Sequence, residues 1–289
     1  MCLITFQWQP NSEQKLVISA NRDEFLNRPA LELHQWEDAD GVFAGKDLTH
    51  GGTWLGVQKT AQKSPRFAFL TNHRDMSPAA RKKTPSNPIS RGKLVLNFLT
   101  SDISASDYLK QLEVTSQQYD GYNIVVAEGD NLGYFSNRSD APAKLLEPGL
   151  YGLSNALLDT PWPKLTQAKS SLNQWLHSDE YEHENERPQL AGLLASTSVA
   201  ADEQLPVTGI GIEMERILSS QKIITPNYGT RCSTGVIWNR CIRGNKDEVV
   251  NKTELGVAGK AEDQIEISEV SWNADGSERS RCQYVIQSS

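Results

Sequence analysis

A cysteine at the second position stands directly ahead of an alternating apolar run. The segment from Cys2 to Trp8 has the alternation of a buried strand, and a side chain as short as Cys2 favours removal of Met1. The mature chain would then begin with a thiol beside its own terminal amine, whose pKa of about 8 makes it a usable base. The alternative interpretation is an apolar strand residue that happens to be a cysteine. A functional thiol would tie the site to the first strand of the fold.

Length, charge and hydropathy exclude several classes of protein. The chain has 289 residues, of which 38% are hydrophobic, enough for the core of one large domain or two small ones. Its net charge of −7 disfavours nucleic acid as a partner. No apolar run approaches about 18 residues, and no basic segment precedes an apolar stretch at the start. We therefore expect no transmembrane segment and a cytoplasmic location.

The spacing of cysteines and histidines predicts neither a metal site nor a disulfide framework. No C-x-x-C pair occurs, and the five histidines show no metal-ligand spacing. We expect no catalytic cofactor and reduced thiols at all four positions, which are Cys2, Cys232, Cys241 and Cys282.

Alternating runs separated by polar turns predict strands that pair as hairpins. The first hairpin joins Cys2 to Trp8 with Lys15 to Ala20 through a turn at Pro10-Asn11-Ser12. The same reasoning predicts further strands at Thr53 to Gln58, Arg66 to Thr71, Asn123 to Glu128, Leu132 to Asn137, Cys232 to Trp238, Gln264 to Val270 and Gln283 to Gln287.

Helical periodicity predicts three helices. The first is expected after Ser90 as its cap, the second over about Ala105 to Gln118, and the third after Thr160 as its cap with Pro161 at the first helical position. Neither half of the chain has a self-sufficient set of strands, so we expect a single domain over residues 1–289. The fold class expected is α+β, with two packed antiparallel sheets between helical layers.

Two charged segments are expected to be exposed loops. The stretch from His73 to Lys93 is basic and rich in proline, which predicts a long polar loop rather than a helix. It is either a solvated surface or the rim of a pocket that attracts carboxylates or phosphates. The segment from Ser178 to Arg187 is acidic and predicts a second exposed loop.

Four polar residues, Asn21-Arg22-Asp23-Glu24, follow the second predicted strand. Because that strand should pair with the first, Arg22 and Asp23 are expected within hydrogen-bonding reach of Cys2. The guanidinium would then lower the thiol pKa, and Asp23 would hold the terminal ammonium. A solvated turn with an Arg–Glu pair is the alternative.

Two glycine motifs and two tryptophans are expected to have structural roles. Gly51-Gly52 permits a positive φ or a bulge, and Gly92 follows the polar loop, so both are expected to be turns. Trp54 and Trp162 are expected in the core rather than as ligand platforms.

Taken together, these motifs resemble the NRDE family, the family of the transport and Golgi organisation protein. The resemblance runs in consistent order from Met1 to about Trp238. It rests on Met1-Cys2, Asn21-Arg22-Asp23-Glu24, Arg28-Pro29, Gly51-Gly52-Thr53-Trp54-Leu55-Gly56, Leu70-Thr71-Asn72-His73-Arg74, Ser90-Arg91-Gly92, Gly152-Leu153-Ser154-Asn155, Asp159-Thr160-Pro161-Trp162-Pro163-Lys164 and Tyr228-Gly229-Thr230-Arg231.

The resemblance implies the four-layer αββα fold of the N-terminal nucleophile hydrolases. It implies a catalytic set of Cys2 as nucleophile, Arg22 and Asp23 as its neighbours, and two amides, Asn72 and Asn155, as donors to the developing negative charge. Lys164 falls where those hydrolases tend to have an arginine. Those hydrolases also hold an aspartate three residues after the arginine, where this chain has Phe25.

For function, the resemblance implies two candidates. The first is an intracellular carrier that binds and traffics haem, which is cargo rather than a catalytic cofactor; the second is a cysteine amidohydrolase. The altered catalytic set ranks the carrier first. Cys2 or His73 would ligate iron, and the expected ligand-binding residues are His73, Arg74, Lys164 and Arg231. A carrier would also make transient contact with a membrane or a haem-acceptor protein.

Overall fold

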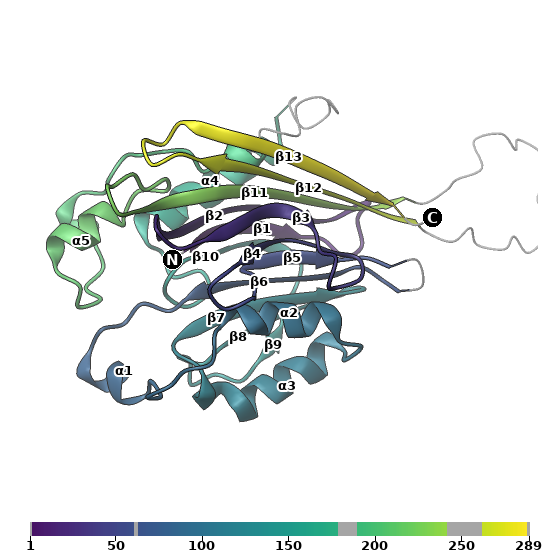
Figure 1. Cartoon of the computed structure of the whole chain (residues 1–289), viewed down its shortest axis with the longest axis horizontal. Helices are drawn as coiled ribbons and strands as arrows, with labels where there is room; N and C mark the ends of the chain where they lie inside the picture. The colour runs from purple at the N-terminus through teal and green to yellow at the C-terminus, as the bar shows by residue number, and fades with distance from the viewer. Residues whose placement is uncertain (1, 61–62, 179–189, 242–261, 288–289) are drawn as a thin grey trace, which may run out of the picture.

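Four layers make up the protein in the computed structural model: two antiparallel sheets pack face to face, and helices cover both outer faces (Figure 1). The structure describes the whole chain except residues 1, 61–62, 179–189, 242–261 and 288–289. This layering confirms the α+β, αββα prediction. None of the helices in the described ranges is long and apolar enough to span a membrane.

The first sheet joins the two ends of the chain. Its strand order is β10-β1-β2-β11-β12-β13, and every pairing is antiparallel. The bounds are β1 Cys2–Trp8, β2 Gln14–Phe25, β10 Gly149–Leu153, β11 Tyr228–Cys241, β12 Glu262–Trp272 and β13 Glu278–Gln287. The strand that carries Cys2 therefore lies inside this sheet, between β10 and β2.

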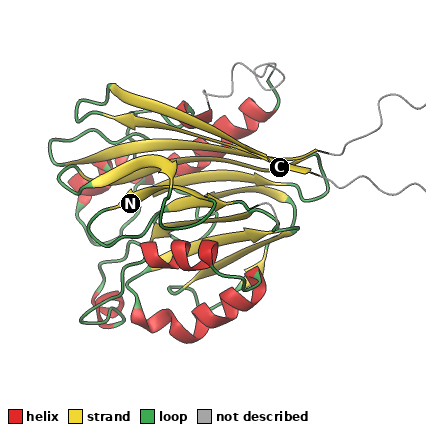
Figure 2. Cartoon of the chain, turned by 45° about the vertical axis from the view of Figure 1, so that its right-hand side comes forward, coloured by secondary structure: helices red, strands yellow, loops and turns green. Residues whose placement is uncertain are grey.

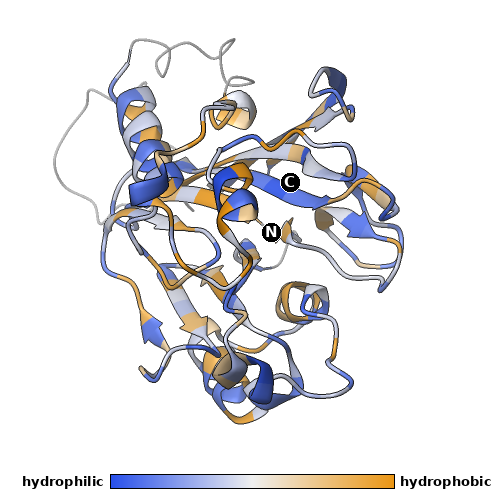
Figure 3. Cartoon of the chain, turned by 90° about the vertical axis from the view of Figure 1, so that its left-hand side faces the viewer, coloured by the Kyte–Doolittle hydropathy of each residue, from blue (hydrophilic) through white to orange (hydrophobic). Residues whose placement is uncertain are grey.

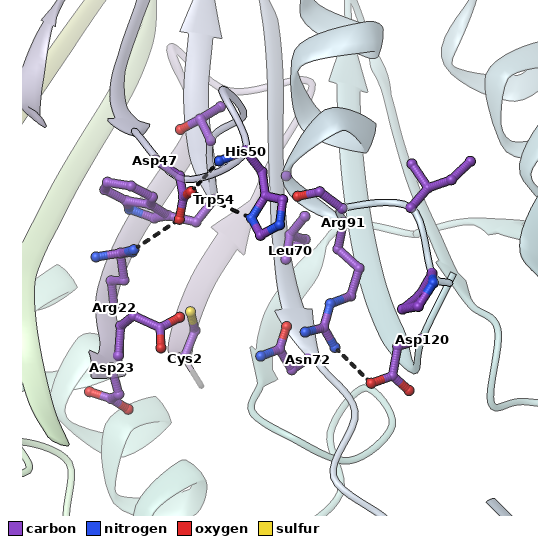
Figure 4. Close-up of a pocket in the computed structure, with 16 residues that line it drawn as sticks. Cys2, Arg22, Asp23, Asp47, His50, Trp54, Leu70, Asn72, Arg91 and Asp120 are labelled. Carbon is purple, nitrogen blue, oxygen red and sulfur yellow. Dashed lines mark hydrogen bonds and ion pairs between the residues drawn. The ribbon is translucent and has the colours of Figure 1, made fainter. Parts of the chain in front are cut away.

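The second sheet follows the chain almost in order, as a series of antiparallel neighbours from β3 to β9. Its strands are β3 Ala30–Gln35, β4 Val42–Asp47, β5 Leu55–Gln58, β6 Arg66–Asn72, β7 Tyr122–Glu128, β8 Asn131–Ser136 and β9 Lys144–Leu145. The end of β6 at Asn72 lies near the start of β1 and forms part of the candidate site (Figure 4).

Aromatic side chains fill the space between the two sheets. Phe67 from the second sheet stacks on Trp238 from the first, with ring centroids 4.8 Å apart, and Phe69 meets Phe6 edge to face at 5.2 Å. All four are almost completely buried. Burying a side chain of this size contributes roughly 1.5–3 kcal/mol, so the alternation read from the strands fixes which face turns inward.

Helices cover the outer faces of the sheets (Figure 2), and each carries both hydrophobic and hydrophilic residues (Figure 3). Helix α2 (Gly92–Thr100) and helix α3 (Ala105–Thr115) pack on the second sheet. Helix α4 (Pro163–Leu176) packs on the first sheet through its buried face of Leu165, Ala168, Leu172 and Trp175. A short helix, α5 (Ile212–Ile217), precedes β11.

The helix starts differ from those predicted. The residue before α2 is Arg91, not Ser90, and its side chain makes no capping hydrogen bond. Helix α4 begins at Pro163, two residues after the predicted Pro161. The reason is steric: a proline disfavours the helical conformation in the residue before it, and Trp162 is accordingly extended, with φ −66° and ψ 143°.

The basic stretch from His73 to Lys93 was predicted as a loop and contains one short helix, α1 (Pro78–Lys82). The prediction was wrong here because Pro78 occupies the first helical position, where its missing N–H costs nothing. Ser77 caps the helix and accepts a hydrogen bond from the Ala80 N–H at 3.2 Å. The acidic segment from Ser178 to Arg187 lies outside the described residues, apart from Ser178.

Four strands were missed, namely β3, β4, β9 and β10. Glycine and exposed polar residues interrupt their patterns, as in the β4 sequence Val-Phe-Ala-Gly-Lys-Asp. The polar tetrad was predicted to follow the second strand, yet β2 continues through all four residues to Phe25. Pairing with β1 on one side and β11 on the other keeps this polar segment extended.

Candidate functional site

Cys2 and Arg22 are direct neighbours in the β1–β2 ladder. Residues opposite each other in an antiparallel pair point to the same face, here toward the second sheet. Cys2 is 7% exposed and Arg22 is 6% exposed. Burial raises the pKa of the Cys2 thiol, the Asp23 carboxylate raises it further, and the Arg22 guanidinium acts in the opposite direction.

The tetrad divides its side chains between two faces because successive residues of a strand point to opposite sides. Asn21 points away from the second sheet, where its amide donates to the carbonyl oxygens of Leu194 at 2.7 Å and Gln221 at 2.9 Å. It also accepts a hydrogen bond from the Ser233 hydroxyl at 2.6 Å. Asn21 is therefore a structural anchor that fixes two loops on the first sheet.

Arg22 is held by an aromatic ring and a carboxylate. Its guanidinium lies 4.1 Å from the centre of the Trp54 ring, and Nη2 lies 3.6 Å from Asp47 Oδ2. Asp47 is also held by Arg28, whose Nε lies 2.5 Å from Oδ2. Although burial acts to raise it, the pKa of Asp47 is below its ordinary value, since Arg28 and backbone N–H groups favour the carboxylate. Trp54 thus packs on the core and also lines the site.

Asp23 lies on the other face of β2, next to β11 and α4. Its Oδ1 accepts a hydrogen bond from the Thr230 hydroxyl at 2.7 Å. Burial raises the pKa of Asp23, and the positive charge of Lys164 is the largest influence that opposes it. Asp23 also lines the pocket that contains Cys2.

Lys164 is a buried lysine behind the Cys2 strand, on α4. Its side chain is 2% exposed, and Nζ makes no hydrogen bond within the described part of the chain. Burial lowers the pKa of Lys164 to about 8, and Asp23 acts in the opposite direction. Lys164 does not line the Cys2 pocket, and Asp23 is the residue of the site whose charge acts most strongly on it, followed by Cys2.

The two predicted amide donors lie side by side but play different parts. Asn72, at the end of β6, lines the pocket. Asn155 is fully buried, and its Nδ2 donates to the backbone carbonyl of Asn72 at 3.0 Å. The carbonyl of Asn155 accepts from the Arg74 N–H at 2.7 Å. Asn155 thus positions Asn72 rather than facing the pocket itself.

Three residues expected to bind a ligand do not line the Cys2 pocket. His73 directly follows the end of β6 and does not line the pocket; burial lowers the pKa of its imidazole. Arg74 is buried in an ion pair with Glu215 at 2.8 Å. Arg231 is the additional residue of a bulge in β11, and its Nη1 donates to the carbonyls of Phe25 at 2.8 Å and Arg28 at 3.1 Å.

The pocket has a volume of about 230 Å³, with Cys2, Arg22 and Asp23 on one wall and Arg91 and Asp120 on the other (Figure 4). Sequence reasoning missed several of its residues. The glycine and Ser90-Arg91-Gly92 motifs were visible signals for Trp54 and Arg91, whereas Asp47, His50 and Asp120 carry no signal because tertiary packing alone brings them together. Its other lining residues are Glu24, Thr53, Leu70, Asn72, Pro88, Ile89, Ser90 and Gly92.

The described residues contain no group of three or more histidine, cysteine, aspartate or glutamate side chains that could hold a metal ion. Cys2, Cys232 and Cys282 are free thiols. Cys232 lies across Arg22 from Cys2 in the same sheet, and its pKa is raised well above the ordinary value by burial and by Glu269. Of these three thiols, Cys2 is the one that lines the pocket.

These features define a class: an αββα protein whose N-terminal strand presents a cysteine beside arginine and asparagine side chains. The model of the Transport and Golgi organisation 2 family matches residues 1–249, and the chain belongs to this family. This finding confirms the family resemblance seen in the motifs.

Curated relatives support the assignment. The chain is 36% identical over 256 residues to the Transport and Golgi organization protein 2 homolog of Bos taurus, covering 82% of this chain and 88% of that protein. It is 32% identical over 256 residues to the Homo sapiens homolog, with the same 82% and 88% coverage. It is 30% identical over 189 residues to the Drosophila melanogaster protein, covering 58% of this chain and 62% of that one.

Among solved structures, the chain is similar to a Caenorhabditis elegans ortholog of N-acylethanolamine-hydrolyzing acid amidase. The TM-score is 0.45 at 9% sequence identity, and the match covers 81% of this chain and 92% of the other.

Proposed function

We propose that the chain is an N-terminal cysteine amidohydrolase that acts on carbon–nitrogen amide bonds. The observation that carries this proposal is the placement of Cys2 on the wall of a 230 Å³ pocket, directly opposite Arg22 in the ladder and with Asn72 on the facing sheet. A nucleophile, a cation and an amide donor around one cavity are the groups that acyl transfer needs.

The proposed reaction begins after removal of Met1. The free amine of Cys2 takes the thiol proton as the sulfur attacks the amide carbonyl, and the Asn72 amide donates to the resulting oxyanion. The C–N bond then breaks, and the leaving amine takes that proton. Water attacks the thioester, again with the terminal amine as base, and releases the acid and the thiol. Each half of the reaction moves one proton through the terminal amine, first from the thiol to the leaving amine and then from water to the departing sulfur, and no external oxidant or reductant is needed.

Electrostatics around Cys2 favour this use of the terminal amine. The thiol is neutral at rest because burial raises its pKa, so a base must act at the moment of attack. Arg22 lies beside the sulfur and stabilises the negative charge that develops on it. Asp23, on the neighbouring position of β2, is suited to orient the terminal ammonium.

Intact mass and a panel of amides test the proposal together. We expect the mature protein to lack Met1, to release amine from at least one class of acylated substrate, and to gain the mass of an acyl group on Cys2. Cys2→Ala should abolish turnover. The matched control is Cys282→Ala, which removes a half-buried thiol from β13 and should leave turnover unchanged. Retention of Met1 in protein from its native host would exclude the mechanism, because a peptide-bonded nitrogen is not a base.

Haem carriage is the second candidate, and one observation favours it. The Cys2 thiol and the His50 imidazole line the same pocket together with apolar Leu70 and Ile89. Both groups are iron ligands in haem proteins. The pocket is smaller than the roughly 300–1,000 Å³ of sites that enclose a drug-sized ligand, so haem would bind with one edge in solvent.

Haem titration separates the two candidates. A carrier binds about one haem per chain, shows a shifted Soret band, and loses that shift in Cys2→Ala or His50→Ala. It would also pass haem to an apo-acceptor protein or take it from a membrane, in keeping with a cytoplasmic location. If the Soret band stays unshifted under reducing conditions and an acyl-enzyme forms, haem carriage is excluded and the hydrolase is the remaining candidate.

A further inference from the structure

We infer that Arg91 is the specificity residue of the Cys2 pocket and that it selects ligands carrying a carboxylate. Arg91 lines the pocket on the wall that faces Cys2 and Arg22 (Figure 4). The inference deepens the proposed function, because it names the class of amide, and it applies equally to the carboxylates of a porphyrin.

Most N–H donors of the Arg91 guanidinium make no hydrogen bond within the described residues. Within the described residues it makes one hydrogen bond, from Nη1 to the carbonyl of Gly121 at 3.0 Å. Its nearest carboxylate oxygen, Asp120 Oδ2, lies 3.8 Å away, beyond hydrogen-bond distance. A guanidinium has five N–H donors, so most of them are left for an occupant of the pocket.

One oxygen of the neighbouring carboxylate is hydrogen-bonded to three other groups. Asp120 Oδ1 accepts from its neighbour Gly121 N–H at 2.6 Å, from the Thr84 hydroxyl at 2.9 Å and from Arg138 Nη2 at 3.2 Å. Burial acts to raise the pKa of Asp120, yet these bonds and Arg91 hold it below its ordinary value. Asp120 is therefore held through Oδ1 by groups other than Arg91, and its Oδ2 contacts Arg91 as an ion pair without a hydrogen bond.

Arg91 is the arginine on the wall of the pocket that lies opposite Cys2. The other one, Arg22, lies on the Trp54 ring and is 3.6 Å from Asp47. Burial lowers the pKa of Arg91, so its positive charge carries a desolvation cost. An incoming anion relieves that cost, and the planar guanidinium matches the two oxygens of a carboxylate.

Two glycines fix where Arg91 stands. A Cβ placed on Gly52 would lie 2.4 Å from the carbonyl carbon of Gly92, and the Thr53 N–H donates to the Gly92 carbonyl at 3.2 Å. The start of α2 therefore packs backbone to backbone against the loop before β5. This contact sets the span between Arg91 and the Trp54 side of the pocket, where Cys2 and Arg22 lie.

The consequence is a ligand that carries a carboxylate for Arg91 as well as the group that reaches Cys2. Apolar Leu70, Pro88 and Ile89 line the same cavity and would contact the apolar part of the ligand. An N-acyl amino acid and a dicarboxylic monoamide both carry a carboxylate and an amide, and a porphyrin carries the carboxylate.

Matched ligands test the inference. The probes are N-lauroylglycine against N-lauroylethanolamine, and mesoporphyrin IX against its dimethyl ester, with binding measured to Cys2→Ala protein and turnover to wild type. We expect tighter binding of the acid in at least one pair. Arg91→Gln should weaken the acid about 10- to 100-fold and the neutral partner by less than about twofold. Arg91→Lys should bind the acid with an affinity between those of wild type and Arg91→Gln, because lysine keeps the positive charge but lacks the planar guanidinium that matches both carboxylate oxygens.

The control is Lys93→Gln, which removes an exposed cation from α2 without touching the pocket. Equal loss of acid and neutral ligands in Arg91→Gln would indicate a structural role and overturn the inference, as would a wild-type protein without preference for the acid. If binding depends on Arg91 but no turnover occurs, the hydrolase proposal is wrong and the carboxylate site is supported. If turnover occurs and does not depend on Arg91, the hydrolase proposal is supported and the carboxylate site is wrong.

Discussion

Cys2 and Arg22 occupy opposite positions of the β1–β2 ladder, and Arg22 is opposite Cys232 on its other side. One guanidinium thus lies between two thiols in a row across three strands. Only Cys2 of the two lines the 230 Å³ pocket. Cys232 is turned into a fully buried environment where Glu269 adds to the pKa increase caused by burial. Reactivity should therefore differ sharply between two cysteines that share one neighbour.

Replacing Arg22 by methionine should slow alkylation of Cys2. The guanidinium lowers the thiol pKa, so its removal should shift the midpoint of the pH–rate profile upward. The rate constant for iodoacetamide, followed at Cys2 by peptide mass spectrometry between pH 6 and 10, reports this shift. Arg28→Met is the control, because Arg28 also pairs with Asp47 and does not act on Cys2. A profile that moves equally in both variants would assign the effect to Asp47.

Replacing Gly52 by alanine should destabilise the protein and displace Arg91. The new Cβ would lie 2.4 Å from a backbone carbon of Gly92, a contact that neither backbone can relieve without moving. We expect a loss of about 2 kcal/mol in the free energy of unfolding by urea. Gly192→Ala provides the comparison, since nothing lies within 4 Å of a Cβ placed there. Equal stability of the two variants would mean that the α2 contact yields easily.

Replacing Lys164 by methionine should change how stability depends on pH. The folded pKa of Lys164 is about 8, below the ordinary lysine value, because burial disfavours the charged amine. Between about pH 8 and 10.5 the unfolded chain therefore binds more protons than the folded one, and wild-type stability gains as pH rises. The difference between wild type and Lys164→Met should move in favour of wild type over this window, by up to roughly 3 kcal/mol.

Urea unfolding at pH 7, 8, 9 and 10 measures this difference. Lys169→Met is the control for losing a lysine from α4, since Lys169 lies nearer the surface with Asp159 at 2.7 Å. A wild-type advantage that stays constant from pH 7 to 10 would mean that Lys164 is not held in a depressed state.

The sequence predicted the parts of the fold and site that depend on local pattern. The hairpin of β1 and β2 follows from alternation over Cys2–Trp8 and a polar turn, and pairing then brings Arg22 to Cys2. The edge strand β3 and the short strand β4 were not predicted, because exposed polar residues and a glycine interrupt their alternation. Local pattern also misplaced the start of α4, where the chain geometry before Pro163 decides.

Site residues that were close in sequence to a motif were the hardest to place. His73 follows Asn72 directly, yet Asn72 ends the strand and lines the pocket whereas His73 lies beyond the strand and does not. Arg231 lies in a bulge, which no propensity reveals, and the bulge directs it to the turn at Phe25. Asp47 and Asp120 come from separate loops and strand ends, so only the packed sheets bring them to Cys2.

Alanine substitutions at Asn72 and at Asn155 distinguish the catalytic amide from the residue that positions it. Asn72 faces the pocket, whereas Asn155 donates to the Asn72 backbone carbonyl at 3.0 Å. Removing one donor to an oxyanion lowers kcat by roughly 100-fold, with little change in KM, because the donor acts on charge that exists only in the transition state.

Asn155→Ala should lower kcat less and should cost stability, because it removes the side-chain donor to the Asn72 backbone carbonyl; losing this part-buried hydrogen bond costs about 1 kcal/mol. Initial-rate kinetics and urea unfolding of both variants, on whichever amide the panel identifies, measure the two effects separately. If Asn72→Ala raised KM and left kcat unchanged, Asn72 would bind substrate instead of stabilising the oxyanion, and the donor would have to be sought among the backbone N–H groups around Cys2.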